Sequence, residues 1–239
     1  VDAGEAEHIA AKIRASSLFE PDSYDAIAGA RAGGHDPALH YVRCGEALGY
    51  APSRKFNPAY YGERYPDLAE SGINLLDHYI SYGRDEGRIP LPSAATLEYP
   101  TGGIDPNRKT VLVIAHEASR TGAPILAWNL VRAFRKRGAN VVVLLMRGGP
   151  IAGAFKDEAS SVVGPMADLH YGNATEAKYV VEALIDAYDI DYVLANSVET
   201  RNFAVEFAKR LVPVVALVHE FSSYYRPRGM LHELYAVAN

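Results

Sequence analysis

Apolar and polar positions follow different patterns in the two parts of the chain. After residue 108, short apolar runs rich in β-branched residues alternate with longer amphipathic stretches. The runs cover 110–116, 140–146, 161–164, 190–197 and 212–220, and the stretches cover 121–138, 150–159, 175–189 and 199–211. Continuously apolar runs are typical of strands buried on both faces. The alternation therefore predicts an α/β fold, a doubly wound parallel sheet with right-handed crossovers.

The first 93 residues contain an internal repeat, with copies at about 17–53 and 54–93. Matching residues recur at offsets of 37 and then 38: Phe19, Pro21 and Tyr24 match Phe56, Pro58 and Tyr61, and His40, Tyr41, Gly45, Gly49 and Pro52 match His78, Tyr79, Gly83, Gly87 and Pro90. Such a period marks one supersecondary unit used twice. We predict a small all-α repeat module in this region.

Each copy is predicted to form two short helices. The Asp-Pro pair at 36–37 and the Asn-Pro pair at 57–58 are N-cap signals, because proline lacks only an N–H that has no partner in a first turn. Gly45 and Gly83 are predicted to end helices in the left-handed conformation. A preceding helix over 5–16 has one apolar face, which consists of Ala6, Ile9, Ala10 and Ile13.

Two features of the repeats have alternative interpretations. His40 and His78 recur, which makes them candidates for a ligand site, but the favoured interpretation is that each packs and hydrogen-bonds against the other repeat. The charged run 83–88 is either a ligand clamp or a solvated turn. The turn is favoured because the first copy lacks the charges.

Residues 94–108 are rich in proline and glycine and have no apolar period, so they are predicted to be a linker. The predicted domains are thus a repeat module at 1–93 and an α/β domain at 109–239. The chain starts at Val1 without a signal-peptide pattern, which we interpret as an excised fragment.

Composition narrows the class of function. The chain has 239 residues, 49% of them apolar, and a net charge of −5, which argues against a nucleic-acid binder because neutralising phosphates needs a basic face. The single cysteine, Cys44, excludes an internal disulfide and a CxxC zinc site, and favours a reducing compartment. No apolar run approaches the ~18 residues of a membrane span.

Polar residues gather at the predicted carboxyl ends of three strands. These are His116 and Glu117, Asn196 and Ser197, and His219 and Glu220. In the common strand order 3-2-1-4-5 the three ends are neighbours, and ligands of such sheets bind outside the carboxyl ends. The sequence therefore predicts one crevice that holds all six side chains.

The loop after the first strand leads into a predicted helix N-terminus. Thr121 is placed to cap the helix, Gly122 lets a ligand approach the backbone, and Pro124 fits the first turn. Such a terminus attracts phosphate or carboxylate. The alternative, equally weighted from spacing alone, is that Thr121 and Gly122 only start the helix.

Several standard motifs are absent from the sequence. There is no GxGxxG at the first turn, no P-loop and no GxSxG elbow. Three His-Glu pairs begin at His116, His219 and His232, but Arg120, Ser223 and Ala236 stand where a zinc peptidase needs its second histidine.

The stretch "VLVIAHEASRTGAPILAWNLVRAFRKRGANVVVLLMRGGPIAGAF" resembles the start of the amino-terminal domain of retaining GT-B glycosyltransferases of the family four type, and the likeness covers 109–239. The closing "VPVVALVHEFSS" resembles that family's fifth strand. The second repeat, "NPAYYGERYPDLAESGINLLDHYISYGRDEGRIP", resembles "HYxxxGxxEGRxP" units found beside glycosyltransferase domains of bacterial polysaccharide enzymes.

The resemblance implies a Rossmann-like half of a GT-B fold. It implies retaining transfer of a sugar from a nucleotide-sugar donor to a glycan or lipid-linked acceptor, with no bound metal and no tightly bound cofactor. The family's second, donor-binding domain is not in the chain, so we expect the acceptor-side half, inactive alone. The implied location is cytoplasmic, with peripheral contact at the inner membrane, and the repeats are candidates for binding a protein partner.

The resemblance also assigns roles to the strand-end residues. His219 would bond the donor sugar and act in catalysis, and the loop of Thr121, Gly122 and Ala123 would face its diphosphate. The implied acceptor contacts are His116, Glu117, Arg120, Asn196, Ser197 and Glu220. For Arg120 the favoured alternative is a solvated loop arginine.

A basic stripe of Arg132, Arg135, Lys136 and Arg137 is a candidate for anionic lipid, with a simple helix C-terminus favoured instead. The competing function is a non-catalytic, flavodoxin-like scaffold with partner-docking repeats. Clustered polar residues at three strand ends distinguish the enzyme from the scaffold, because a scaffold does not need them.

Overall fold

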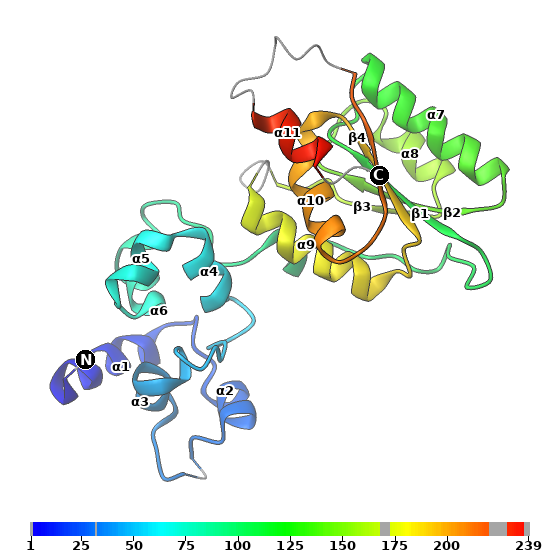
Figure 1. The fold of residues 1–239 in the computed structure, drawn as a ribbon. Helices are drawn as coiled ribbons and strands as arrows, with labels where there is room; N and C mark the ends of the chain where they lie inside the picture. Colours follow the sequence, from blue (N-terminus) through cyan, green and yellow to red (C-terminus); the bar gives the residue numbers. More distant parts are fainter. Residues whose placement is uncertain (1, 32, 168–172, 220–228, 237–239) are drawn as a thin grey trace. The chain divides into compact units, whose positions relative to one another are not determined.

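The computed structural model describes residues 2–31, 33–167, 173–219 and 229–236. It divides into two compact units, Val1–Pro92 and Ser93–Asn239 (Figure 1). The first is all-helical and the second is a Rossmann-like α/β unit, so the predicted fold class is confirmed.

The helices of the repeat unit recur in the two copies of the repeat. They are α1 (Ala3–Ala15), α2 (Pro21–Ala28), α3 (Pro37–His40), the π-helical turn η1 (Tyr41–Gly45), α4 (Pro58–Arg64), α5 (Pro66–Ser71), α6 (Leu75–His78) and the π-helical turn η2 (Tyr79–Gly83). The four apolar residues predicted for one face of α1 are all buried. Asp36 and Asn57 cap α3 and α4 through their side chains, as predicted.

The second copy contains an extra helix that the prediction of two helices per copy missed. Helix α4 ends at Arg64, and Pro66 starts α5. Tyr65 between them has φ −126° and ψ 73°, outside the helical region, because a residue before proline is driven away from the α conformation.

Gly45 and Gly83 do not end helices in the left-handed conformation, so that prediction was wrong. They lie inside the π-helical turns, where a Cβ would overlap the hydroxyl group of Tyr24 or of Tyr61. The left-handed residue after each turn is Gly49 or its counterpart Gly87 (φ 81° and 69°). The repeated Gly45 and Gly83 therefore make room for a buried tyrosine.

Each of these tyrosines bonds to the repeated histidine of its own copy. The Tyr24 hydroxyl lies 2.7 Å from His40 Nδ1, and the Tyr61 hydroxyl lies 3.1 Å from His78 Nδ1. The histidine side chains are half-buried, and their hydrogen-bond partners lie in the same copy, so the predicted hydrogen bond to the other copy is wrong.

A partly buried carboxylate joins the two copies. Glu46 accepts hydrogen bonds from the Tyr41 hydroxyl (2.7 Å) and from the backbone N–H groups of Leu75 (2.8 Å) and Leu76 (3.2 Å) at the start of α6. Burial raises the pKa of Glu46, although these hydrogen bonds oppose the rise. Its counterpart in the second copy is Arg84, so this link occurs once.

The α/β unit contains the five predicted strands in one parallel sheet. The strands are β1 (Thr110–Ala115), β2 (Asn140–Leu145), β3 (Ser161–Val163), β4 (Tyr192–Asn196) and β5 (Val214–Leu217), and the helices are η3 (Ser93–Ala95), α7 (Gly122–Lys136), α8 (Ala152–Glu158), α9 (Ala174–Ala187), η5 (Val198–Thr200), α10 (Arg201–Lys209) and α11 (Gly229–Tyr235). The strand order is β3-β2-β1-β4-β5, as predicted.

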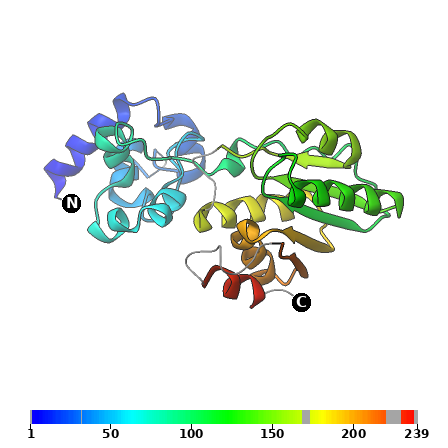
Figure 2. The same cartoon turned by 90° about the horizontal axis from the view of Figure 1, so that it is seen from above.

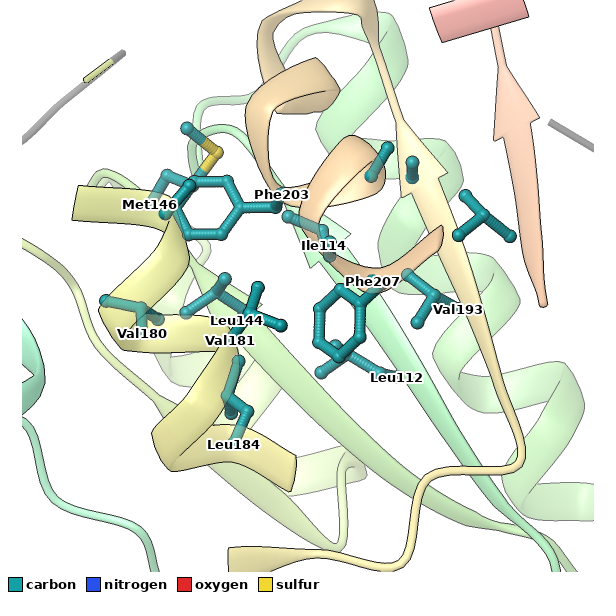
Figure 3. Close-up of a cluster of buried hydrophobic side chains, with 14 of the residues drawn as sticks. Leu112, Ile114, Leu144, Met146, Val180, Val181, Leu184, Val193, Phe203 and Phe207 are labelled. Carbon is teal, nitrogen blue, oxygen red and sulfur yellow. The ribbon is translucent and has the colours of Figure 1, made fainter. Parts of the chain in front are cut away.

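Helices cover both faces of the sheet (Figures 1 and 2). Alternate residues of β1 point to opposite sides: Val111 and Val113 pack under α7 and α8, while Leu112 and Ile114 pack under α9 and α10. Figure 3 shows the second layer, where Phe203 and Phe207 of α10 meet sheet residues and side chains of α9. An apolar core thus packs against each face of the sheet and fixes the strands in place.

The predicted linker packs as part of the α/β unit, and the unit begins at Ser93. Leu97, Tyr99 and Ile104 are partly buried against its core. The Ser93 N–H donates to the buried carboxylate of Glu176 at 2.5 Å. Helix α11 was not predicted, and its Leu231 and Leu234 belong to the same core.

Candidate functional site

The carboxyl ends of β1, β4 and β5 are neighbours at one edge of the sheet. In the parallel register Ala115 pairs with Asn196, and Asn196 pairs with Leu217. His116 and Glu117 directly follow β1, and His219 lies two residues beyond β5. The structure therefore brings together the strand ends that the sequence singled out.

A buried asparagine links two of these segments to the helix that follows β1. Asn196 has no solvent-exposed surface, and its Nδ2 donates to the backbone oxygen of Ala123 in the first turn of α7 at 2.9 Å. Its Oδ1 lies 2.8 Å from Nε2 of His219, which is an exposed residue. Three predicted site residues from three segments are thus connected.

Ser197 is also fully buried, and its backbone is strained. Its φ of 107° is rare for a residue with a side chain. Its N–H donates to the Leu217 oxygen at 2.9 Å, and its hydroxyl accepts from the Glu199 N–H at 3.3 Å. The burial of Asn196 and Ser197 contradicts the prediction that their side chains line an open crevice and contact the acceptor.

A second cluster surrounds Glu117. Its carboxylate accepts from the Ser119 hydroxyl (2.6 Å) and from Arg147 Nη2 (3.1 Å). The hydrogen bond from Ser119 lowers the pKa of Glu117, with support from His116 and Arg147, although partial burial opposes this. His116 Nε2 lies 3.8 Å from the carboxylate, and among the described residues its buried Nδ1 has no hydrogen-bond partner.

Arg147 is the site residue that the sequence interpretation missed. It lies two residues after the end of β2, the neighbour of β1 on the other side. The strand-end rule that selected the other residues applies equally to this position. Gly149 brings the two loops together, because a Cβ there would overlap the backbone of Ala118.

The loop into α7 differs in one detail from the prediction. Thr121 occupies the N-cap position, but its side chain does not cap the helix, and its hydroxyl lies 2.8 Å from the Ser119 hydroxyl instead. At Gly122 a Cβ would meet no atom within 4 Å, so the first turn is open there. Arg120 is exposed.

The basic stripe on α7 is largely tied to neighbouring groups. Arg132 lies over the Trp128 ring at 4.9 Å, and its Nε is 3.3 Å from Glu158. Arg135 and Arg137 donate to backbone oxygens at the end of the helix. These contacts favour the interpretation as a helix C-terminus.

Four further observations concern the site and its surroundings. The predicted Glu220 lies outside the described residues. Within the described part of the chain, no group of three or more His, Cys, Asp and Glu side chains is placed to hold a metal ion, and no helix is long and apolar enough to cross a membrane. A hollow of about 480 Å³ lies away from the site, beside the edge strand β3, with Glu98 and Lys156 among its lining residues.

The comparison with protein families matches residues 107–231, a little over half of the chain, to the model of glycosyl-transferase family 4. The chain belongs to this family. The match includes all five strands and every described strand-end residue of the site. The repeat unit lies outside it.

Comparisons with individual proteins add little to the family assignment. No curated protein matches the chain. Among solved structures, the glycosyltransferase SnogD from Streptomyces nogalater is similar at 16% identity and a TM-score of 0.37, over 54% of this chain and 39% of that one. The chain thus spans well under half of the length of that structure.

Proposed function

We propose that the protein acts as a retaining GT-B glycosyltransferase in bacterial polysaccharide synthesis. It would transfer a sugar from a nucleotide-sugar donor to a glycan or lipid-linked acceptor, and this chain would supply the acceptor-side half. The observation that carries the proposal is the family match over 107–231, which includes the polar groups gathered at the carboxyl edge of the sheet.

The site offers the groups that this chemistry needs. Sugar transfer passes through an oxocarbenium-like state while a diphosphate leaves. The protein must therefore direct hydrogen-bond donor groups at the leaving diphosphate and must hold the sugar by hydrogen bonds. We assign the loop of Thr121, Gly122 and Ala123 to the diphosphate, and we assign His219 to the sugar. The first turn of α7 is open at Gly122. His116, Glu117 and Arg120 remain proposed acceptor contacts, together with Glu220.

The test is His219→Ala in the full-length enzyme, with His232→Ala as the matched control because His232 is an exposed histidine on α11. Turnover with a nucleotide-sugar donor should fall at least about tenfold in the first variant and remain unchanged in the second, while both keep the circular dichroism of the parent. Full activity of His219→Ala would rule out its catalytic role.

The chain of 239 residues on its own should show no sugar transfer. Detectable transfer by this chain would contradict the division into acceptor-side and donor-side halves. A full-length protein that neither binds nor consumes any nucleotide sugar would instead favour the scaffold.

A further inference from the structure

The hydrogen bonds around Asn196 determine which nitrogen of His219 carries the proton. The backbone oxygen of Ala123 can only accept, so the amide NH₂ of Asn196 must face it at 2.9 Å. The amide oxygen then faces His219 Nε2 at 2.8 Å, and an oxygen without a proton requires an N–H opposite.

We infer that Asn196 is a positioning residue that holds His219 as its Nε2–H tautomer and ties the ring to the first turn of α7. Nδ1 is then the accepting nitrogen of the neutral ring. The tautomer stands on the contacts alone, and its consequence for catalysis rests on the proposed function.

The surroundings of Asn196 explain why its amide is held in one orientation. It ends a strand that pairs on both sides, with Ala115 of β1 and Leu217 of β5. The next residue, Ser197, adopts φ 107° and donates its N–H to the Leu217 oxygen. Strained backbone of this kind persists only where its surroundings fix it, and such positions cluster at functional sites.

The link also couples two groups that the proposed function assigns to one donor molecule. Ala123 belongs to the turn assigned to the diphosphate, and His219 is assigned to the sugar. Asn196 contacts both and is fully buried. One side chain thus sets the geometry between them, which is how a supporting group pre-organises a site.

The first test is a nitrogen-15 correlation spectrum of the histidine side chains of the 239-residue chain, recorded where the ring is neutral. His219→Gln identifies the signals. We expect a single Nε2–H tautomer for His219 in the parent chain and in the control Asn107→Ala, which changes an exposed asparagine. In Asn196→Ala we expect averaged signals from a ring that exchanges between tautomers.

A proton on Nδ1, or averaged signals already in the parent chain, would overturn the inference. The parent spectrum decides even where Asn196→Ala fails to fold. In the full-length enzyme, Asn196→Ala should lower kcat about tenfold with little change in the donor KM, and adding His219→Ala should cause no further loss. If the double variant lost kcat by the product of the two single-variant factors, Asn196 would not act through His219.

The two proposals fail in different ways. An active His219→Ala enzyme whose parent chain still shows the fixed tautomer would remove the catalytic assignment and leave the tautomer intact. A mixed tautomer together with an inactive His219→Ala enzyme would remove Asn196 as a positioning residue and leave the proposed function intact.

Discussion

The two units of the chain place their histidine and polar side chains differently. In the repeat unit, the Tyr24–His40 and Tyr61–His78 bonds join a buried tyrosine to a half-buried histidine and occur once per copy. In the α/β unit the central strands are mostly apolar along their length, and the polar residues of the candidate site lie at the carboxyl ends of the strands. The duplicated histidines, His40 and His78, therefore have a structural role in the repeat unit. His219 has no duplicate and belongs to the candidate site.

The largest expected effect comes from Gly45→Ala. A Cβ at this position would overlap the hydroxyl of Tyr24. The tyrosine must then move and give up its bond to His40, so we expect a loss of about 3 kcal/mol in the free energy of unfolding of the repeat unit. Urea denaturation followed by circular dichroism measures it.

The matched control is Gly49→Ala, four residues later. A Cβ there meets no atom within 4 Å, and only its φ of 81° opposes a side chain, which costs about 1 kcal/mol. Equal losses of unfolding free energy in the two variants would show that the contact with Tyr24 is not the reason why position 45 needs glycine.

Next in size is Glu46→Ala, which removes the carboxylate between the copies. The N–H groups of Leu75 and Leu76 and the hydroxyl of Tyr41 lose their acceptor. We expect the unit to lose about 2 kcal/mol. An unchanged denaturation midpoint would contradict a role for Glu46 in joining the copies.

Glu46 also gives the repeat unit a pH dependence of known sign. Its pKa is raised above the ordinary 4.5, so the folded state favours the protonated form. Its contribution to stability is complete below that ordinary value and declines as the pH rises through the folded pKa. Glu46→Gln should remove this decline, which denaturation at pH 4 and at pH 7 would reveal.

Much of the fold could be predicted because its signals are local. The five apolar runs become five parallel strands in the expected order, and the apolar face of the first helix is buried residue by residue. Apolar periodicity reports burial directly, and proline after an N-cap residue reports a helix start.

The failures come from contacts that are distant in the sequence. Gly45 is required by the hydroxyl group of Tyr24, and the predicted linker packs through Leu97 on a core made by later segments of the chain. At the site, residue type and strand position selected Asn196, but only the fold shows that it is buried behind His219. Tertiary packing thus decided which polar residues face solvent.

A smaller effect is expected from Tyr24→Phe, which tests the structural role of the repeated histidines. The change removes one hydroxyl from a buried ring and leaves His40 Nδ1 without that partner. Stability should fall by about 1 kcal/mol, while glycosyl transfer by the full-length enzyme should stay at the parental rate. Loss of transfer in a folded variant would place the repeated histidines in the catalytic machinery.

The smallest expected effect, with the opposite pH sign, comes from Glu117→Gln in the α/β unit. The pKa of Glu117 is lowered, chiefly by the Ser119 hydroxyl, so its contribution is present above the ordinary 4.5 and is lost as the pH falls through the folded pKa. The pair with Arg147 is partly exposed, so the substitution should cost only about 0.5 kcal/mol at pH 7 and less at pH 4. Unfolding curves of parent and variant at both pH values measure the difference. A cost that grew on acidification would show that Glu117 responds to pH as Glu46 does. The two units would then not differ in how their carboxylates depend on pH.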